Sequence, residues 1–303
     1  MQNNEKPLVS VVIPCYNHEK FVQDCIQSVI DQTYENIELI IIDDGSKDSS
    51  VDKIKEMIPL CEERFSRFEF RYRPNKGLSS TLNEGLEWCN GKYFSAIASD
   101  DQMLEYKIKI QVEYLESSGK CVGVFGGVIS IDTNGNYRKK FKVKSQLFSF
   151  DEILLGNYTI YAPTQMYILN SLKKVGGFSE DTILEDLDIL LKITSSGGRI
   201  DNIDKILSKY REHENNITKK TITILDEENK VISKYKKFPQ YKQAKRNLLK
   251  RKIMKISFLN RSDSRKIALS SFKSKDINLF MFIILYVYTF IPFLIIYGFK
   301  KVF

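Results

Sequence analysis

The first hundred residues alternate between short apolar segments and amphipathic ones, and this alternation is the strongest constraint on the fold. The segments of strand character occupy residues 8–13, 37–42, 68–72 and 93–98. Helical periodicity fills the gaps between them, over about residues 19–32, 49–63 and 79–89. Three successive strand–helix–strand units build a mostly parallel sheet with helices on both faces. The sequence therefore predicts an α/β fold.

The regular alternation ends after Asp101. A helix near residues 105–118 and a strand over residues 122–131 follow, and Asn134-Gly135 marks a turn. Farther on, the segment VGGFSEDTILEDLDILLKI predicts a helix that begins with two acids, Glu185 and Asp186. The predicted buried face of that helix consists of Leu187, Leu190, Leu191 and Ile193.

Polar residues that do not suit a core stand directly after the predicted strands. They are Tyr16-Asn17, Asp43-Asp44-Gly45-Ser46, Asn75-Lys76-Gly77 and Ser99-Asp100-Asp101. Open α/β sheets bind ligands at the edge where the carboxyl ends of their parallel strands meet, so we expect the functional site there. The first strand is not followed by a glycine-rich phosphate loop, which argues against a dinucleotide-binding fold and a P-loop.

The pair Asp43-Asp44 has two interpretations. A turn before a helix explains one Asp, with Gly45 supplying a permissive backbone and Ser46 or Asp48 capping the helix. A carboxylate at a strand end can instead accept a hydrogen bond from a nucleobase or a ribose hydroxyl. On these residues alone, the turn is the better-supported interpretation.

Asp100 and Asp101 pose a similar choice. An acid suits the start of the helix that follows them. Two adjacent carboxylates near a second Asp pair repel each other, however, and call for a counter-ion. Carboxylate oxygens in this setting suit Mg²⁺ or Mn²⁺ bound to a diphosphate, and the sequence slightly favours such a metal site.

Two acids and two histidines are further candidates. Glu185 and Asp186 are ordinary helix-start residues, or one of them is a general base. His213, in the segment YREH, is by itself more often a packing residue than a ligand. His18 lies in a Tyr-Asn-His loop, where we expect local hydrogen bonding.

Taken in order, these segments resemble the family 2 glycosyltransferases of the GT-A fold. The resemblance extends over residues 8–216. It rests on residues 9–50, NKGLSSTLNEG (75–85), ASDD (98–101), GGFSED followed by LEDLDI, and YREH. Each motif alone is weak, whereas the ordered set at these spacings is specific.

The resemblance implies that a sugar is transferred from a nucleotide-sugar donor, with a UDP-sugar favoured, to a saccharide hydroxyl with inversion. It implies a nucleotide site formed by Pro14, Tyr16, Asn17, Asp44, Asn75, Gly77 and Asp100. It implies Mg²⁺ or Mn²⁺ on Asp101, Asp100 and His213, with Asp101 as the more direct ligand. Asp186 would be the general base, and Glu185 is the alternative.

Two residues depart from the family pattern. Ala98 stands where many relatives carry an acid, which weakens the expected metal site. Leu82 stands where many relatives carry Arg, which removes a phosphate or ribose contact.

The charge of the chain is divided unevenly. The whole chain carries +8, residues 230–275 carry +15 and residues 276–303 carry +1, which leaves −8 for residues 1–229. A solvated helix face, a nucleic-acid site and an anionic membrane surface each explain such a basic segment. No nucleic-acid-binding motif is present, and we do not expect a nucleic-acid partner.

The apolar segment at residues 279–299 favours the membrane surface among these three explanations of the basic segment. It has 21 residues without a charge, and as a helix of about 1.5 Å per residue it is long enough to cross a bilayer. Pro292 leaves a re-entrant or interfacial helix open, and a buried core helix is the remaining alternative. Five cysteines without a CxxC pair and an N-terminus without signal-peptide character suit the cytoplasm.

We therefore predict a GT-A catalytic domain at residues 1–225, a basic helical membrane-surface segment at 226–275 and an apolar membrane-associated segment at 276–303. The predicted enzyme works at the cytoplasmic face of the bacterial inner membrane, held by its C-terminal anchor. Its predicted acceptor is a lipid-linked saccharide in the assembly of a surface polysaccharide. A non-catalytic nucleotide-sugar or membrane-surface binding protein of the same fold is the alternative.

Overall fold

The computed structural model describes residues 6–214, 221–259, 261–273 and 279–289, which form two compact units. Unit 1 contains the described residues up to Phe150 and those from Tyr158 to residue 214. Unit 2 contains Asp151–Asn157 and the described residues from 221 onward. The predicted domain boundaries at residues 225 and 275 stay predictions.

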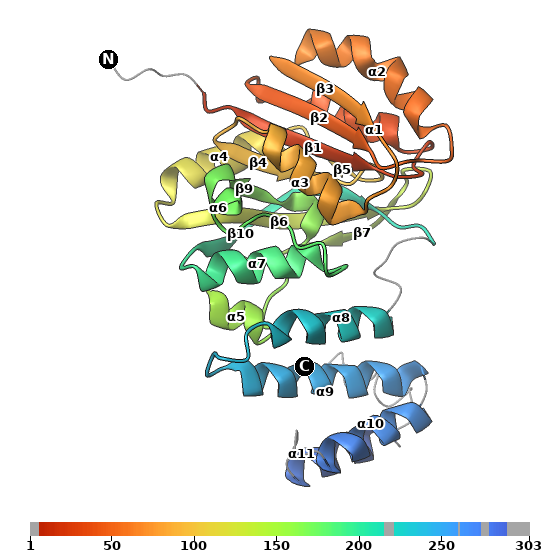
Figure 1. Cartoon of the computed structure of the whole chain (residues 1–303), viewed down its shortest axis with the longest axis vertical. Helices are drawn as coiled ribbons and strands as arrows, with labels where there is room; N and C mark the ends of the chain where they lie inside the picture. The colour runs from red at the N-terminus through yellow and green to blue at the C-terminus, as the bar shows by residue number, and fades with distance from the viewer. Residues whose placement is uncertain (1–5, 215–220, 260, 274–278, 290–303) are drawn as a thin grey trace. The chain divides into compact units, whose positions relative to one another are not determined.

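Unit 1 begins with the alternating elements that the sequence predicts. In chain order they are β1 (Val9–Cys15), α1 (Val22–Ile30), β2 (Ile37–Asp43), α2 (Ser50–Arg64), β3 (Arg67–Tyr72), α3 (Leu78–Trp88) and β4 (Tyr93–Ala96). These four strands pair in parallel in the order β3-β2-β1-β4 (Figure 1). The predicted mostly parallel α/β sheet is therefore confirmed.

The later part of unit 1 completes the sheet. Its elements are β5 (Gln102–Met103), α4 (Lys107–Ser117), β6 (Cys121–Ile131), β7 (Tyr137–Phe141), β8 (Gln146–Phe148), a 3₁₀ turn (Ala162–Thr164), β9 (Met166–Ile168), α6 (Leu169–Lys174), α7 (Glu185–Ser195) and β10 (Arg199–Arg211). The sheet continues from β4 in the order β9-β6-β10-β5. β9 is antiparallel to both of its neighbours, and β6 and β10 are parallel to each other.

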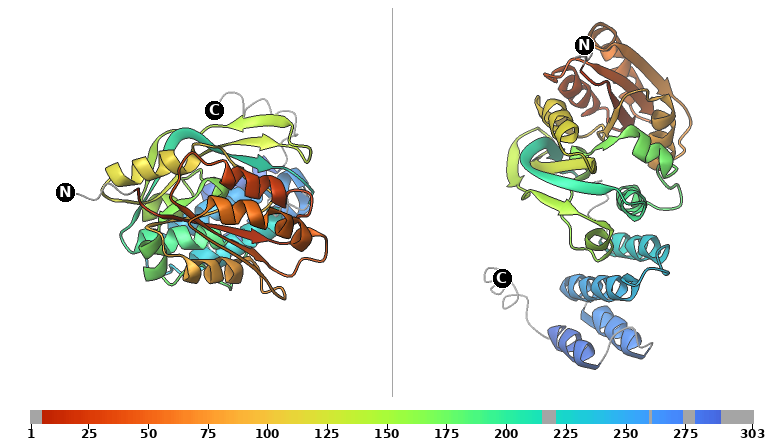
Figure 2. Two further views of the ribbon diagram at one scale, coloured as in Figure 1. Left: turned by 90° about the horizontal axis from the view of Figure 1, so that it is seen from above. Right: turned by 90° about the vertical axis from the view of Figure 1, so that its left-hand side faces the viewer.

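Helices cover both faces of this sheet (Figure 1 and Figure 2). Side chains of α1, α2 and α4 form one core with the alternate β1 residues Val9, Val11 and Ile13. α3 packs on the opposite face, where a Cβ atom at Gly85 would lie 2.6 Å from Cγ1 of Val12. The polar residues after β1, β2 and β4 are thus left at the carboxyl edge of the sheet, as predicted.

Unit 2 is helical. It contains most of α5 (Phe150–Leu154), and α8 (Thr221–Ser233), α9 (Tyr241–Leu259), α10 (Arg261–Lys273) and α11 (Leu279–Tyr288). Ile253, Ala268 and Leu285 form its small buried core between α9, α10 and α11. The predicted helical character of the basic segment is confirmed.

The predicted membrane-crossing segment is only partly described, because its residues 290–299 lie outside the described residues. Within the described ranges, no helix is both long enough and apolar enough to cross a bilayer.

Candidate active site

Asp100 and Asp101 lie in the loop after β4, and Arg211 at the end of β10 holds that loop. The Arg211 backbone N–H donates to Oδ1 of Asp101 at 2.8 Å, and its Nε donates to the Asp100 carbonyl at 2.9 Å. Its remaining nitrogens contact Oδ2 of Asp24 at 2.9 Å and two backbone carbonyls after β6. Arg211 is 1% exposed. Its guanidinium fixes the backbone of the Asp100-Asp101 loop and places a positive charge near Asp101.

The two acids have different surroundings. Asp101 is buried, and its burial together with the charge of Asp100 raises its pKa well above the usual range. Burial would also raise the pKa of Asp100, but the hydrogen bond with His213 and the charges of His18 and His213 lower it below the usual value. Asp100 is therefore the carboxylate that stays ionised and faces other ligand atoms.

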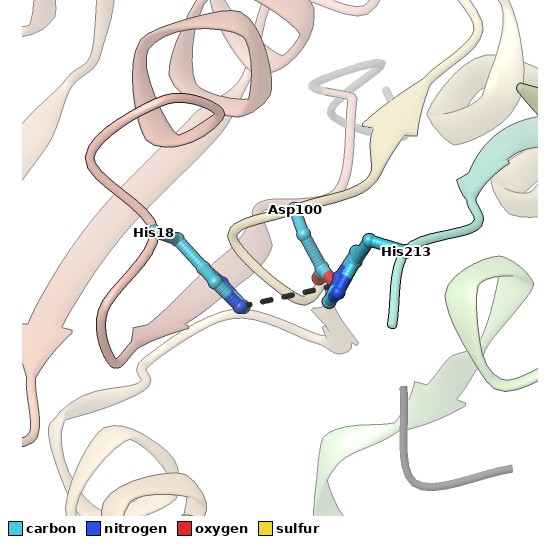
Figure 3. Close-up of side chains that lie close together, drawn as sticks. All are labelled: His18, Asp100 and His213. Atoms are coloured by element: carbon cyan, nitrogen blue, oxygen red, sulfur yellow. Dashed lines mark hydrogen bonds and ion pairs between the residues drawn. The ribbon is translucent and has the colours of Figure 1, made fainter. Parts of the chain in front are cut away.

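His18, Asp100 and His213 form a compact cluster (Figure 3). Nε2 of His213 lies 2.7 Å from Oδ2 of Asp100, and Nε2 of His18 lies 4.0 Å from the same oxygen. The three ligand atoms lie within 4.8 Å of one another. Cation–nitrogen and cation–oxygen bonds of about 2.0–2.2 Å place neighbouring ligand atoms roughly 3.0–3.5 Å apart. Small side-chain movements therefore fit this cluster around a divalent cation.

The two residues of the second acid pair, Asp43 and Asp44, have different hydrogen-bond partners. Asp43 accepts hydrogen bonds from the backbone N–H groups of Gly45 and Ser46 at 3.1 and 2.9 Å, which forms the predicted turn. Asp44 is 5% exposed and contacts Arg73. It also accepts the backbone N–H groups of Lys76 at 2.8 Å and Gly77 at 2.9 Å, so it fixes the loop after β3.

The Asp44 carboxylate can accept one more hydrogen bond, from a ligand. Its Oδ1 receives Arg73 and the Lys76 N–H, whereas its Oδ2 receives the Gly77 N–H. A carboxylate accepts about four hydrogen bonds, so one site on Oδ2 remains for a donor such as a nucleobase N–H.

The loop after β1 is tied to the loop after β2. Asn17, which has a φ of 55°, accepts the Lys47 N–H on its side-chain oxygen at 2.8 Å and donates its own N–H to Ser46 at 2.8 Å. Tyr16 is 43% exposed, and Asn75 is exposed. Pro14 lies inside β1, opposite Ile42. The predicted nucleotide-binding residues thus come from adjoining loops, except for Pro14.

Glu185 and Asp186 open α7 as predicted, and the four expected apolar residues of that helix are buried. Burial and the charge of Asp186 raise the pKa of Glu185 to about 8. The surrounding protein also raises the pKa of Asp186, while the backbone N–H of Leu187, which donates to Oδ1 at 2.7 Å, limits that rise. Burial, then the charges of both acids, raise the pKa of Tyr167, so the pair lies near β9.

Comparison with known proteins decides the family. The family model described as glycosyl transferase family 2 matches residues 10–176. The chain belongs to this family. An uncharacterized glycosyltransferase of Rickettsia typhi is 31% identical to it over 241 residues, which cover 75% of this chain and 70% of the relative. One of Methanocaldococcus jannaschii is 29% identical over 212 residues, covering 68% of this chain and 71% of the relative.

Solved structures show the GT-A fold of this glycosyltransferase. The structure of S. aureus TarS residues 1–349 in complex with UDP-GlcNAc matches with a TM-score of 0.59 and 18% identity, covering 89% of this chain and 88% of that one. The mannosyltransferase PcManGT of Pyrobaculum calidifontis, in complex with GDP-Man and Mn²⁺, matches with a TM-score of 0.65 and 13% identity, covering 93% and 79%.

The structure of the glycosyltransferase refines the predicted site. It brings Asp100 and His213 together, whereas Asp101 accepts the Arg211 N–H; the assignment of Asp101, Asp100 and His213 as metal ligands stays a prediction. The hydrogen bond of the His18 ring is not the local one expected: Nδ1 lies 2.8 Å from Oγ of Ser99, in the loop after β4, and the ring also joins the cluster.

Two arginines of the site were not predicted from the sequence. Arg211 stands two residues before His213 in YREH, and Arg73 directly follows β3. In each case the available signal is a charged residue at a strand end that faces an Asp pair across the carboxyl edge.

Proposed function

We propose that this glycosyltransferase transfers a sugar from a nucleotide-sugar donor to a saccharide hydroxyl with inversion at the anomeric carbon. The observation that supports it best is the joining of the loops after β1 and β2, which place Asp44 near the strand end that carries His18. His18 in turn lies beside Asp100 after β4 and His213 after β10. A nucleoside site and a cation site at one sheet edge suit a nucleoside diphosphate.

The residues divide the chemistry between them. Asp44 orients the base, and a divalent cation held by Asp100 and His213 would neutralise the charge that develops on the diphosphate. Asp186 accepts the proton of the acceptor hydroxyl as general base. A UDP-sugar is the proposed donor, supported by the TarS structures with UDP and UDP-GlcNAc, whereas the PcManGT complex contains GDP-Man.

A donor screen tests this proposal. We expect UDP release from a UDP-sugar with Mn²⁺ and a membrane lipid extract as acceptor, and loss of that release after a chelator removes the metal. The same screen includes GDP-sugars, so that another nucleotide class would be seen. Tight UDP binding without turnover on any lipid-linked acceptor would instead support a non-catalytic nucleotide-sugar binding protein.

We further propose that unit 2 binds an anionic membrane surface at the cytoplasmic face of the bacterial inner membrane, which makes a lipid-linked saccharide the acceptor and surface-polysaccharide assembly the role. α11 exposes Leu279, Phe280, Ile283, Ile284 and Val287, each at least 49% exposed. α9 and α11 also line a pocket whose residues include Arg246, Lys250 and Met281. Apolar side chains beside basic ones suit an interface of anionic headgroups, where each basic residue contributes about 1 kcal/mol.

Sedimentation of the full chain with vesicles tests the membrane proposal. We expect binding to vesicles that contain phosphatidylglycerol, weaker binding to phosphatidylcholine alone, and at least about tenfold weaker binding for Phe280→Ser/Ile284→Ser, because two exposed apolar side chains no longer enter the interface. Ile222→Ser, which changes a 48% exposed side chain of α8, is the matched control. Equal binding by both variants and the wild type would contradict the proposal.

A further inference from the structure

We infer that His18 is a direct ligand of the cation, so that two imidazoles and one carboxylate hold it and the site prefers Mn²⁺ or a similar transition-metal ion over Mg²⁺. This inference rests on the proposed function, because it concerns the cation of that same site. It assigns to the loop after β1 a role that its sequence did not indicate.

The position of the His18 ring supports ligation. Its Nδ1 lies 2.8 Å from Oγ of Ser99, while its Nε2 lies on the side of Asp100, 4.0 Å from Oδ2 (Figure 3). Metal-bound histidines use one ring nitrogen for the cation and engage the other in a hydrogen bond that fixes the ring. A closure of about 0.5 to 1 Å brings Nε2 to the spacing of neighbouring ligands.

The backbone and packing around His18 limit its motion. Its backbone N–H donates to Oγ of Ser50 at 2.9 Å, which anchors the loop to α2. Phe21 stacks on His213 with ring centroids 5.7 Å apart and lies 6.1 Å from the His18 ring. The two imidazoles meet edge to face at 5.8 Å. They are therefore held on either side of Asp100 before any ligand arrives.

The residues next to Asp100 in the loop after β4 cannot replace His18 as a ligand. Ala98 has no ligand atom, and Asp101 is 2% exposed and accepts the Arg211 N–H. Without His18, the described residues near Asp100 would offer one carboxylate and one imidazole. Imidazole nitrogen suits transition metals, whereas Mg²⁺ prefers oxygen ligands and retains its water, so a donor set of two nitrogens and one oxygen favours Mn²⁺.

Pulsed electron paramagnetic resonance of Mn²⁺ bound to the wild-type protein in the presence of UDP tests this inference directly. Nitrogen modulation of the Mn²⁺ signal reports how many imidazoles are coordinated. We expect two in the wild type. One coordinated imidazole, from His213 alone, would overturn the inference, and this result needs no variant.

Titration calorimetry with variants adds a second measurement. His18→Ala should lose one imidazole and bind Mn²⁺ at least about tenfold more weakly, while Mg²⁺ affinity changes little. Phe21→Leu is the matched control, because it alters the packing around the rings and keeps every ligand. If His18→Ala does not fold, His18→Gln keeps a polar side chain without imidazole. Equal Mn²⁺ affinity for a folded His18 variant and the wild type would also overturn the inference.

These measurements separate the inference from the proposed function. Two coordinated imidazoles in a protein that transfers no sugar would support the ligand assignment and contradict the proposed function. One coordinated imidazole in an active transferase would do the reverse.

Discussion

Replacing Asp186 with Asn should lower kcat about 10²- to 10⁴-fold, the range that general acid–base catalysis contributes, while UDP affinity stays nearly unchanged. The amide keeps the shape of the side chain but cannot take the proton of an acceptor hydroxyl. Asp186 is an exposed residue in the first turn of α7. Initial rates of UDP release and UDP titration calorimetry on the same preparations measure the two effects.

Glu185→Gln is the matched control, because it changes the adjacent carboxyl group. Burial and the charge of Asp186 raise the pKa of Glu185 to about 8, so its side chain is mostly protonated at neutral pH. Gln resembles that protonated form, and the variant should keep most of the wild-type rate near pH 7. A loss in Glu185→Gln that equals the loss in Asp186→Asn would make Glu185 the base.

The pH dependence provides an independent check on Asp186. A general base must be ionised to accept a proton, and the surrounding protein raises the pKa of Asp186. Raising the pKa moves the loss of activity to higher pH, so the rate should fall with decreasing pH already above the usual range of an aspartate. The acid limb should be absent from the residual activity of Asp186→Asn. Persistence of the same limb in that variant would assign it to another group.

The first half of the fold could be predicted because its elements carry clear periodicity. Residues 37–42 are apolar except for Glu38, and β2 is buried along its whole length. β10, in contrast, has the sequence RIDNIDKILSKYR, without regular alternation, and its pairing with β6 shifts register at three places. Tertiary pairing stabilises such a strand, because buried Asp201 and Asn202 find partners in Arg199 and in the carbonyl of Thr159.

The site was predictable in location but not in its partners. Parallel topology alone places residues after β1, β2 and β4 at one edge, which explains why Asp44 and Asp100 were found. Which of two adjacent acids faces inward depends on contacts with distant residues. Arg211, 110 positions after Asp101 in the chain, decides it by donating its backbone N–H to Asp101. The spacing of residues along the sequence does not predict such a contact.

Arg211→Met should lower the free energy of unfolding of unit 1 by about 1–3 kcal/mol, the usual cost of leaving buried hydrogen-bond acceptors without their donor. Arg211 is 1% exposed, and loss of its guanidinium leaves the Asp100 carbonyl without that donor, whereas the backbone N–H at position 211 still reaches Asp101. Urea unfolding followed by fluorescence measures this, since Trp88, the one tryptophan of the chain, lies in α3 of unit 1. The affinity of Arg211→Met for Mn²⁺ should also fall, because the guanidinium no longer holds the loop that presents Asp100.

Two further variants show whether the loss of stability depends on the buried position of Arg211 and on the planar shape of its guanidinium. Arg138→Met removes a 52% exposed arginine that pairs with Glu212 at 3.2 Å, and it should cost no more than the ~1 kcal/mol of an exposed ion pair. Arg211→Lys keeps the charge but not the planar fork that reaches Asp24 and the Asp100 carbonyl together, so it should recover only part of the stability. Equal losses for Arg211→Met and Arg138→Met would show that the Asp100-Asp101 loop holds its shape without Arg211.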